Sequence, residues 1–198
     1  MYFVEGNIGV GKSTLVKALE ERGLSTLQEP VDSWSTTTNE NGKNILEEFY
    51  TAPKRWAYTF QSIAFRTRIM GMDTISDDCI VERSVYTDRM VFAESARDSG
   101  NIDDIEWNDY TNWFDFVMNK IGKRPRGIIY LRGSPETCME QIKKRGRKGE
   151  ENIDMDYLRL LHRKHDNWLI NEDNVLVLDI DNMDRSTFVD RILAFVSE

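Results

Sequence analysis

The part of the sequence best suited to phosphate chemistry is a glycine-rich stretch near its start, which fits the pattern G-x-x-x-x-G-K-S. In such a loop the glycines let backbone N–H groups curl around phosphate oxygens, the lysine reaches the outer phosphates, and the serine hydroxyl can hold Mg²⁺. An apolar run precedes the stretch and a helical pattern follows it, so a helix dipole also favours the anion. The pattern predicts a nucleoside triphosphate site formed by Gly6, Asn7, Ile8, Gly9, Val10, Gly11, Lys12, Ser13 and Thr14.

Acidic and basic side chains stand at the ends of two further apolar runs. Glu29 comes just before Pro30, and Glu82 and Arg83 end the next run. Ligands of open α/β sheets lie outside the carboxyl ends of the strands, so these groups are expected to face the bound phosphates. Glu29 is then a candidate base for an acceptor hydroxyl, Glu82 a group that orients the metal ion through water, and Arg83 a cation that neutralises phosphate charge.

Each of these side chains also has an ordinary structural interpretation. A solvated surface Glu29, or an ion pair from Arg83 beside a helix-capping Ser84, is as plausible when the residues are taken singly. The catalytic interpretation gains support because these side chains occur together at successive strand ends. A phosphate cradle, a metal holder, a base and a cation are the parts that phosphoryl transfer needs.

The elements that must position these residues alternate between strands and helices. None of the five apolar runs "MYFV", "LSTLQ", "CIVE", "GIIYL" and "VLVLDI" alternates with polar residues, which predicts parallel strands covered on both faces. The pattern predicts an α/β fold. A polar, turn-rich stretch at 35–44 is expected to be a surface loop. Helical patterns cover residues 13–22, 53–74, 84–97, 103–121, 134–145, 155–171 and 186–196.

Length and composition narrow the possible classes of protein. A chain of 198 residues is expected to form one domain, 1–198. Its net charge of -8 argues against nucleic acid or an anionic membrane as a partner. There is no apolar run of about 18 residues, so no membrane span is expected. Cys79 and Cys138 lack metal-ligand spacing, which favours reduced thiols. The first residues already have strand character, so we expect no signal or transit peptide and a cytoplasmic protein.

Five blocks of the sequence resemble, in order and spacing, the deoxyribonucleoside kinases of the deoxycytidine, deoxyguanosine and deoxyadenosine kinase type. The likeness runs from about residue 3 to residue 169. It implies a P-loop kinase fold with a five-stranded parallel sheet, helices on both faces and a homodimer. It also implies ATP- and Mg²⁺-dependent phosphorylation of the 5′-hydroxyl of deoxyribonucleosides in nucleotide salvage. The blocks are "GNIGVGKST", "EPVDSW", "RWAYTFQ", "ERSVYTDRMVFA" and "RGRKGEENIDMDYLRLLHRKHDNWL".

The resemblance implies specific catalytic roles. Glu29 matches the base that takes the 5′-hydroxyl proton, and Glu82 joins Ser13 near Mg²⁺. The locally basic stretch "KKRGRKGE" matches a mobile LID at about residues 143–153, although alone it reads as a solvated helix end or a chance basic patch. The implied catalytic residues are Lys12, Glu29, Arg83, Arg145 and Arg147.

The resemblance also implies the contacts with the nucleoside. Gln61 matches a reader of the base edge, Arg68 and Asp88 a charged pair over the base, and Tyr50 and Glu150 the groups that hold the sugar 3′-hydroxyl. Gln61 and Arg68 are seven residues apart, so they share one helix face with Phe65, and Ala64 lies on the same side. Without the resemblance, the aromatic residues would be ordinary core and Gln61 a helix-surface residue. The aromatic walls of the cleft are expected to be Trp34, Phe49 and Phe92.

Further expectations concern specificity and regulation. Arg68 and Asp88 favour deoxycytidine or purine deoxynucleosides, because a thymine methyl group would meet a charged pair there. A deoxynucleoside triphosphate is expected to inhibit by filling both substrate sites. Gln141 stands where some relatives carry an arginine beside the donor adenine, and the donor-base loop is expected near 181–184.

Three other interpretations stay open at this point. A nucleoside monophosphate kinase would call for an arginine-rich acceptor site. A GTPase switch would call for an N-K-x-D-like guanine motif, which the sequence lacks. A catalytically silent kinase fold could serve as a structural subunit, but it would be free to lose Lys12, Glu29 or Glu82, and all three are present. His162 and His165 lack neighbouring ligand residues and are interpreted as structural or solvated.

Overall fold

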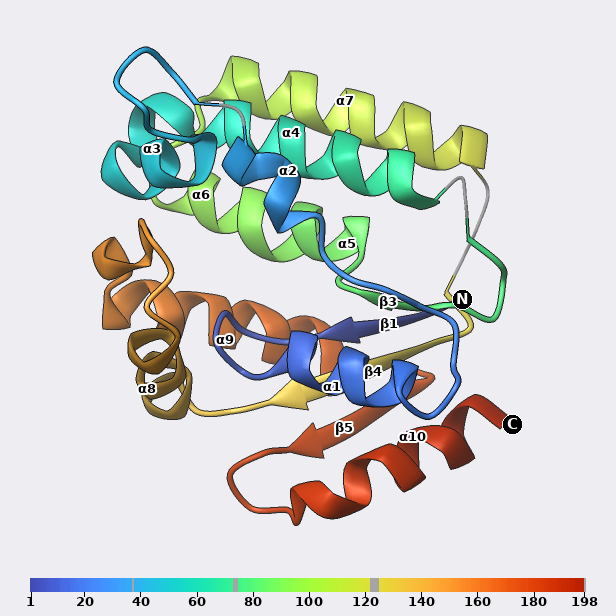
Figure 1. Ribbon diagram of the computed structural model, residues 1–198. Coiled ribbons are helices and arrows are strands. Elements are labelled where there is room, and N and C mark those ends of the chain that lie inside the picture. The colour runs from blue at the N-terminus through green and yellow to red at the C-terminus, as the bar shows by residue number, and fades with distance from the viewer. Residues whose placement is uncertain (37, 73–74, 122–124, 198) are drawn as a thin grey trace.

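The computed structural model describes residues 1–36, 38–72, 75–121 and 125–197. At its centre, these residues form a parallel sheet with the strand order β2-β3-β1-β4-β5 (Figure 1). The inner strands are almost fully buried, which explains why their sequences are apolar throughout. The prediction of a five-stranded parallel sheet is therefore confirmed. The strands are β1 (Tyr2–Glu5), β2 (Thr26–Leu27), β3 (Ile80–Glu82), β4 (Gly127–Arg132) and β5 (Val175–Asp179).

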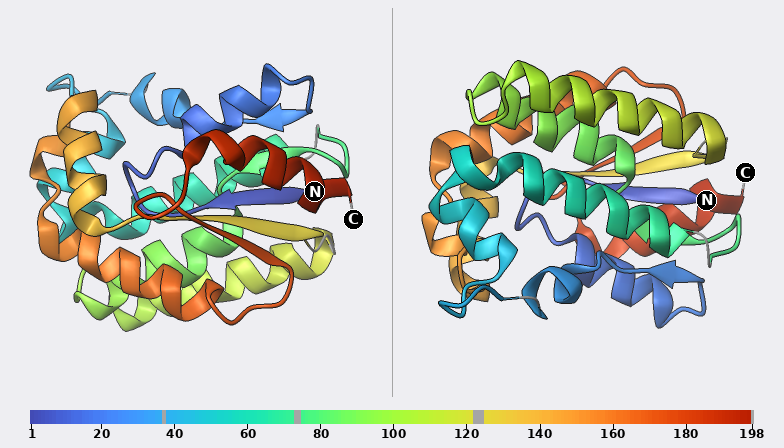
Figure 2. Two further views of the ribbon diagram at one scale, coloured as in Figure 1. Left: turned by 90° about the horizontal axis from the view of Figure 1, so that it is seen from below. Right: turned by 90° about the horizontal axis from the view of Figure 1, so that it is seen from above.

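Helices cover both faces of this sheet. Figure 2 shows α1 and α10 on one face, and α4, α7 and α9 on the other. Side chains alternate along β1 accordingly, so that Val4 packs with α1 and Phe3 packs with α4 and α7. The helices are α1 (Lys12–Glu20), α2 (Val31–Thr36), α3 (Ile45–Thr51), α4 (Pro53–Met72), α5 (Val85–Thr87), α6 (Glu94–Asp98), α7 (Asp104–Ile121), α8 (Pro135–Arg145), α9 (Met155–Leu169) and α10 (Phe188–Ser197).

Several helix ends follow from local chemistry. Gly23, at φ 87°, ends α1 with bonds from its own N–H to the Glu20 carbonyl and from the Leu24 N–H to the Leu19 carbonyl. This is the glycine-terminated pattern that the sequence predicts. At the start of α8, Ser134 accepts a bond from the Thr137 N–H, with proline in the first helical position.

The structure differs from the sequence predictions in three places. Helices α2 and α3 were not predicted, and α2 extends to Thr36 inside the expected loop at 35–44. The expected helix at 84–97 is instead α5, a π-helix η1 (Asp88–Ala93) and α6. The run "LSTLQ" contributes only two paired residues, at the edge of the sheet. The last two positions of the expected helix 53–74 lie outside the described residues.

Short 3₁₀ turns complete the fold, η2 (Glu150–Asn152) before α9 and η3 (Arg185–Thr187) before α10. Cys79 and Cys138 are both buried and free. Within the described ranges, we find no helix with the length and apolar character needed to cross a membrane.

Candidate active site

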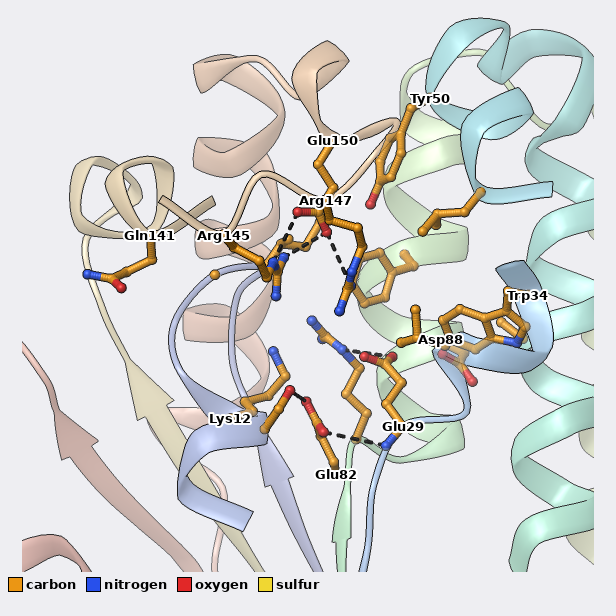
Figure 3. Close-up of a pocket in the computed structure, with 18 of the residues that line it drawn as sticks. Lys12, Glu29, Trp34, Tyr50, Glu82, Asp88, Gln141, Arg145, Arg147 and Glu150 are labelled. Atoms are coloured by element: carbon orange, nitrogen blue, oxygen red, sulfur yellow. Dashed lines mark hydrogen bonds and ion pairs between the residues drawn. The ribbon is translucent and has the colours of Figure 1, made fainter. Parts of the chain in front are cut away.

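A cavity of about 490 Å³ opens where the carboxyl ends of β1 and β3 meet the segment after β2 (Figure 3). The glycine-rich loop after β1 forms one side, and α3 and α4 form the other. The residues between them come from the ends of β2 and β3. Lining residues that the sequence predicted are Ile8, Gly9, Gly11, Lys12, Ser13, Thr14, Glu29, Trp34, Tyr50, Gln61, Arg68, Glu82, Arg83, Asp88, Phe92, Arg145, Arg147 and Glu150.

The glycine-rich loop has a conformation that only glycine can adopt at two positions. Gly6 has φ 140°, and a Cβ atom there would lie 2.3 Å from the Leu131 carbonyl oxygen. Gly9 has φ 80°, and its Cβ would lie 2.5 Å from the Cys138 carbonyl oxygen. The loop therefore packs directly on β4 and α8, and this close approach fixes its curl.

The Lys12 ammonium group is folded back onto the loop. Its Nζ donates to the carbonyl oxygens of Gly6, at 3.1 Å, and Asn7, at 2.8 Å. Burial, and next the charge of Arg83, lowers the pKa of Lys12 to about 7. An anion in the loop would give this buried ammonium group the counter-charge that the carbonyls supply only in part.

Three residues of the predicted loop hold it in place without lining the cavity. The Asn7 side chain donates to the Leu158 carbonyl oxygen in α9 and accepts from the Ile8 N–H. Val10 is buried in the core, and Gly6 packs on β4. Their predicted part in phosphate binding is through the backbone, which these contacts keep rigid.

Ser13 and Glu82 lie side by side at the base of the cavity. The Ser13 hydroxyl donates to Oε1 of Glu82 at 2.7 Å, and the Glu29 N–H approaches Oε2 at 3.4 Å. The Glu82 side chain is almost fully buried. A hydroxyl and a carboxylate are hard oxygen ligands of the kind that Mg²⁺ takes together with water and phosphate oxygens, so these residues fit that ion.

Glu29 is held by two arginines. Its Oε1 accepts from Arg68 at 2.5 Å and lies 3.2 Å from Nε of Arg83. Burial alone would raise the pKa of Glu29, but the charges of Arg68 and Arg83 outweigh it and lower the pKa to about 2. The Arg68 guanidinium donates through Nε to Asp88 at 2.7 Å, so one arginine joins both carboxylates.

Arg83 has an unusual backbone. Its φ of 63° lies in the left-handed region, which costs about 1–3 kcal/mol for a residue other than glycine. Its guanidinium carbon lies 4.7 Å from the centre of the Phe92 ring. Within the described part of the chain its Nη1 has no hydrogen-bond partner although it is buried. The strained turn thus directs a cation with a spare donor into the cavity.

The far side of the cavity combines a buried side-chain amide with an aromatic ring. Gln61 is 1% exposed, and its Nε2 has no hydrogen-bond partner among the described residues. A buried amide donor without a partner costs about 1–3 kcal/mol, which a base edge would relieve. The Trp34 ring is fixed beside it, because Nε1 donates to the Thr67 hydroxyl at 3.0 Å. Ala64 also lines this side, whereas Phe65 packs in the core.

The placement of Phe49 differs from the prediction. Its ring is buried and does not line the cavity; instead it stacks on Phe60 at a centroid distance of 4.8 Å. Phe60 and Leu46 supply the apolar wall. The reason is the packing of α3 on α4, which turns Phe49 toward α4 and leaves its neighbour Tyr50 facing the cavity.

Both predicted LID arginines bind Glu150. Arg145 donates to its two oxygens at 3.1 and 2.7 Å, and Arg147 donates to Oε1 at 3.2 Å (Figure 3). Glu150 is 3% exposed, so this pair of cations is what balances its charge. Gln141 and the unpredicted Lys144 line the same end of the cavity.

The expected donor-base loop at 181–184 has another visible role. Asp181 accepts from the Ser134 N–H and the Thr137 hydroxyl at the start of α8.

The two histidines also lie outside the cavity. His162 approaches Asp166 at 3.3 Å, whereas His165 is buried with Nδ1 2.7 Å from the Leu161 carbonyl oxygen.

Sequence reasoning missed Glu5, which ends β1 directly before the loop. It is fully buried, and its Oε1 accepts from the Ser84 N–H at 2.8 Å. Burial raises the pKa of this carboxyl group. The bond joins the ends of β1 and β3 and so supports the turn at Arg83. A charged residue closing an apolar strand was the signal that could have revealed it.

Comparison with known proteins agrees with this geometry. The family model described as deoxynucleoside kinase matches residues 2–198. The chain is 39% identical over 211 residues to the probable deoxycytidine kinase of fowlpox virus (strain NVSL), covering 98% of this chain and 87% of that protein. It is 37% identical over 236 residues to deoxycytidine kinase 2 of Gallus gallus, covering 98% and 89% of the two chains.

A relative with a different name is equally similar. The thymidine kinase of Ictalurid herpesvirus 1 (strain Auburn) is 38% identical over 197 residues, which cover 98% of this chain and 84% of that protein. The matches to all three relatives span nearly the whole chain, as the family model does. With its parallel sheet, its glycine-rich phosphate loop and these matches, the chain belongs to the deoxynucleoside kinase family.

Proposed function

We propose that this enzyme transfers the γ-phosphoryl group of ATP to the 5′-hydroxyl of a deoxyribonucleoside. The observation that carries the proposal is that one cavity joins Lys12 of the phosphate loop to the buried Gln61, whose Nε2 has no hydrogen-bond partner among the described residues. Glu29 lies between them. A nucleoside with its base on Gln61 would direct its sugar hydroxyl toward Glu29 and the phosphates.

In this proposal Glu29 accepts the proton of the 5′-hydroxyl as the oxygen attacks phosphorus. Arg83, with its spare donor, faces the charge that builds on the transferring group. Lys12 exchanges the carbonyl oxygens of Gly6 and Asn7 for phosphate oxygens. Arg145 and Arg147 close on the transferring phosphate with the N–H groups that Glu150 leaves free.

Ser13 and Glu82 would hold Mg²⁺ in the same proposal. Their contact at 2.7 Å places two oxygen ligands next to the phosphate loop. When bound, the ion would neutralise part of the negative charge of the phosphates. The residues of the chain orient the acceptor and handle its proton.

For the acceptor, we propose deoxycytidine or a purine deoxynucleoside in preference to thymidine. This preference is supported by the Arg68–Asp88 pair, which lines the cavity with both side chains nearly buried. A thymine methyl group near this pair would desolvate it without a compensating bond. The thymidine kinase of Ictalurid herpesvirus 1 is about as similar to this chain as the probable deoxycytidine kinase of fowlpox virus is, so the preference has to be tested directly.

A nucleoside monophosphate kinase is less well supported. On the nucleoside side, Arg68 is already bound by Glu29 and Asp88, so it has little capacity for an acceptor phosphate. The silent structural fold is disfavoured because Lys12, Glu29 and Glu82 are brought together in one cavity. Release of ADP from ATP with each of the four deoxynucleosides, and with the corresponding monophosphates, separates these possibilities. Turnover with monophosphates alone would overturn the proposal.

We also propose a homodimer and inhibition by deoxynucleoside triphosphates. The dimer is supported by exposed aromatic side chains on α7, where the rings of Trp113 and Phe116 stack outward at a centroid distance of 5.7 Å. The inhibition is supported by the continuity of the cavity from Gln61 to Lys12, which one triphosphate could span.

A further inference from the structure

The LID, residues 143–153, is attached to α3, the helix that forms part of the nucleoside side of the cavity. Lys148 Nζ lies 2.8 Å from Oε1 of Glu47, which belongs to α3. The residues Leu46 and Tyr50 of the same helix line the cavity. Neither Glu47 nor Lys148 has a part in the chemistry described above.

The Glu47 carboxylate is fixed in position by its own helix. Its Oε2 accepts from the Asn44 N–H at 3.0 Å, and its N–H donates to Oδ1 of Asn44 at 2.9 Å. This reciprocal capping box immobilises the side chain, which is 8% exposed. The bond from Asn44, and next the contact with Lys148, lowers the pKa of Glu47, so the group is a carboxylate at neutral pH. One oxygen is left to face the LID.

The LID backbone also lies directly on Glu47. Gly149 has φ 91°, and a Cβ atom there would lie 3.2 Å from both Cα and Cγ of Glu47. A side chain at this position would therefore meet α3 and is disfavoured by the backbone as well. The LID backbone at Gly149 is therefore packed directly against α3.

The residue that follows this contact, Glu150, binds the two LID arginines, Arg145 and Arg147. The position of α3 thus sets the position of Glu47, then of Lys148 and Gly149, and through them of the two arginines. A nucleoside packed on Leu46 and Tyr50 would stabilise α3 in this position.

We propose that Glu47 is a positioning residue that couples the two substrate sites, so that a bound deoxynucleoside raises the affinity of the enzyme for the donor nucleotide. The proposal rests on the proposed function for the identity of the acceptor. Because coupling between two sites is reciprocal, the donor nucleotide also tightens binding of the deoxynucleoside. Glu47 touches neither substrate and acts through Lys148 and Gly149.

The test measures binding of ADP by calorimetry, with and without a saturating amount of the deoxynucleoside that the wild type phosphorylates fastest. The wild type should bind ADP more tightly when the deoxynucleoside is present. We define the ratio as the dissociation constant of ADP without the deoxynucleoside divided by that with it. In Lys148→Met this ratio should fall by about two- to fivefold, since Lys148 is 75% exposed and an exposed ion pair contributes little free energy. Lys148→Arg should restore the ratio, because it keeps the charge.

Two further variants make the result specific. Lys43→Met removes a cation that also acts on Glu47 but lies at the start of α3 and not in the LID, so it should leave the ratio unchanged. Gly149→Ala should also lower the ratio, because its methyl group would crowd Glu47 and strain the backbone at φ 91°. A merely structural role would change the melting temperature of the variants and leave the ratio alone.

Equal ratios in the wild type, Lys148→Met and Gly149→Ala would overturn the inference, as would a wild type with no coupling. If such a wild type still phosphorylates a deoxynucleoside, the proposed function stands and the coupling alone is refuted. If the wild type neither binds nor phosphorylates any of the four deoxynucleosides, the proposed function fails, and the inference fails with it.

Discussion

Arg68 donates a hydrogen bond of 2.5 Å to the carboxylate of Glu29. The arginine that is expected to read the nucleobase and the carboxylate that is expected to accept the proton are therefore in direct contact. Arg68 also donates through Nε to Asp88. A substitution of Glu29, Arg68 or Asp88 therefore changes the electrostatic surroundings of the other two side chains. For base specificity, variants of Arg68 and Asp88 must therefore be compared by ratios between substrates, because their absolute rates also report the contact with Glu29.

Glu29→Gln should lower kcat by about 10²–10⁴-fold, because the amide keeps the shape but cannot take the 5′-hydroxyl proton. The measurement is steady-state phosphorylation of the preferred deoxynucleoside. Binding of that deoxynucleoside, followed by calorimetry, should change far less than the rate and serves as the control. A kcat near that of the wild type would show that another group is the base.

Arg68→Met combined with Asp88→Ala should raise the thymidine to deoxycytidine ratio of kcat/KM by at least about tenfold, or about 1.4 kcal/mol of discrimination. The charged pair is replaced by apolar surface that accepts a methyl group. The loss of the Arg68 contact with Glu29 affects both substrates and cancels in the ratio. Arg66→Met, an exposed arginine on the same helix, is the matched control and should leave the ratio unchanged. A wild type that already prefers thymidine would contradict the proposed specificity.

Trp113→Glu combined with Phe116→Glu should convert a dimer into a monomer of 23.1 kDa, measured by light scattering at micromolar concentration. These side chains are 52% and 53% exposed, and a charge on each would oppose burial against a partner. Tyr110 and Phe114 of the same helix face the core. Ile170→Glu, an exposed apolar residue at the end of α9, is the control and should keep the wild-type mass. A wild type of 23.1 kDa would exclude the dimer.

A deoxynucleoside triphosphate should inhibit competitively with ATP and with the deoxynucleoside. Its base would occupy the Gln61 end of the cavity and its phosphates the Lys12 end, so one molecule excludes both substrates. The measurement is the inhibition pattern with each substrate varied in turn. The corresponding deoxynucleoside without phosphates should compete with the acceptor only. A noncompetitive pattern against both substrates would place the inhibitor elsewhere.

Asp166→Asn should reduce stability at neutral pH by about 1–3 kcal/mol, the usual contribution of hydrogen bonds to a charged group. Asp166 accepts from Tyr130 at 2.6 Å and from Arg132 at 3.1 and 2.9 Å. Burial opposes ionisation, but these bonds lower the pKa of Asp166 below its model-peptide value of 3.8.

The sign of the pH dependence follows from that lowered pKa. A carboxylate with a lowered pKa in the folded state stabilises the protein above the unfolded value, and this stabilisation is lost as the pH falls through the folded pKa. The difference in unfolding free energy between the wild type and Asp166→Asn should therefore shrink as the pH falls below 3.8. Urea denaturation across this range measures it. A difference that grows as the pH falls below 3.8 would contradict the assignment.

Much of the site could be predicted because it depends on local spacing and on one topological rule. The glycine-rich loop is a continuous pattern, and its conformation is set by its own glycines. Glu29 and Glu82 are far apart in the sequence, but parallel strands bring their ends to the same edge of the sheet. This rule needs only the correct assignment of the strands.

What could not be predicted depends on how helices rotate against one another. Phe49 and Phe60 are both aromatic residues at plausible positions, and only the packing of α3 on α4 decides which one faces the cavity. The start of α3 did have a signal, since Asn44 and Glu47 have the spacing of a capping box. The polar, turn-rich stretch before it obscured this pattern, and the contact of Glu47 with the LID is a long-range feature without a local signature.

The π-helix η1 also gives this part of the chain tolerance to a change in length. Asp88 begins η1 and Phe92 lies within it, and both side chains line the cavity. A π-helical turn holds one residue more than an α-helical turn, so the loss of one codon here would convert η1 toward an α-helix without rotating the helices on either side. If the codon lay between Asp88 and Phe92, the two residues would then be three apart and would still share one face.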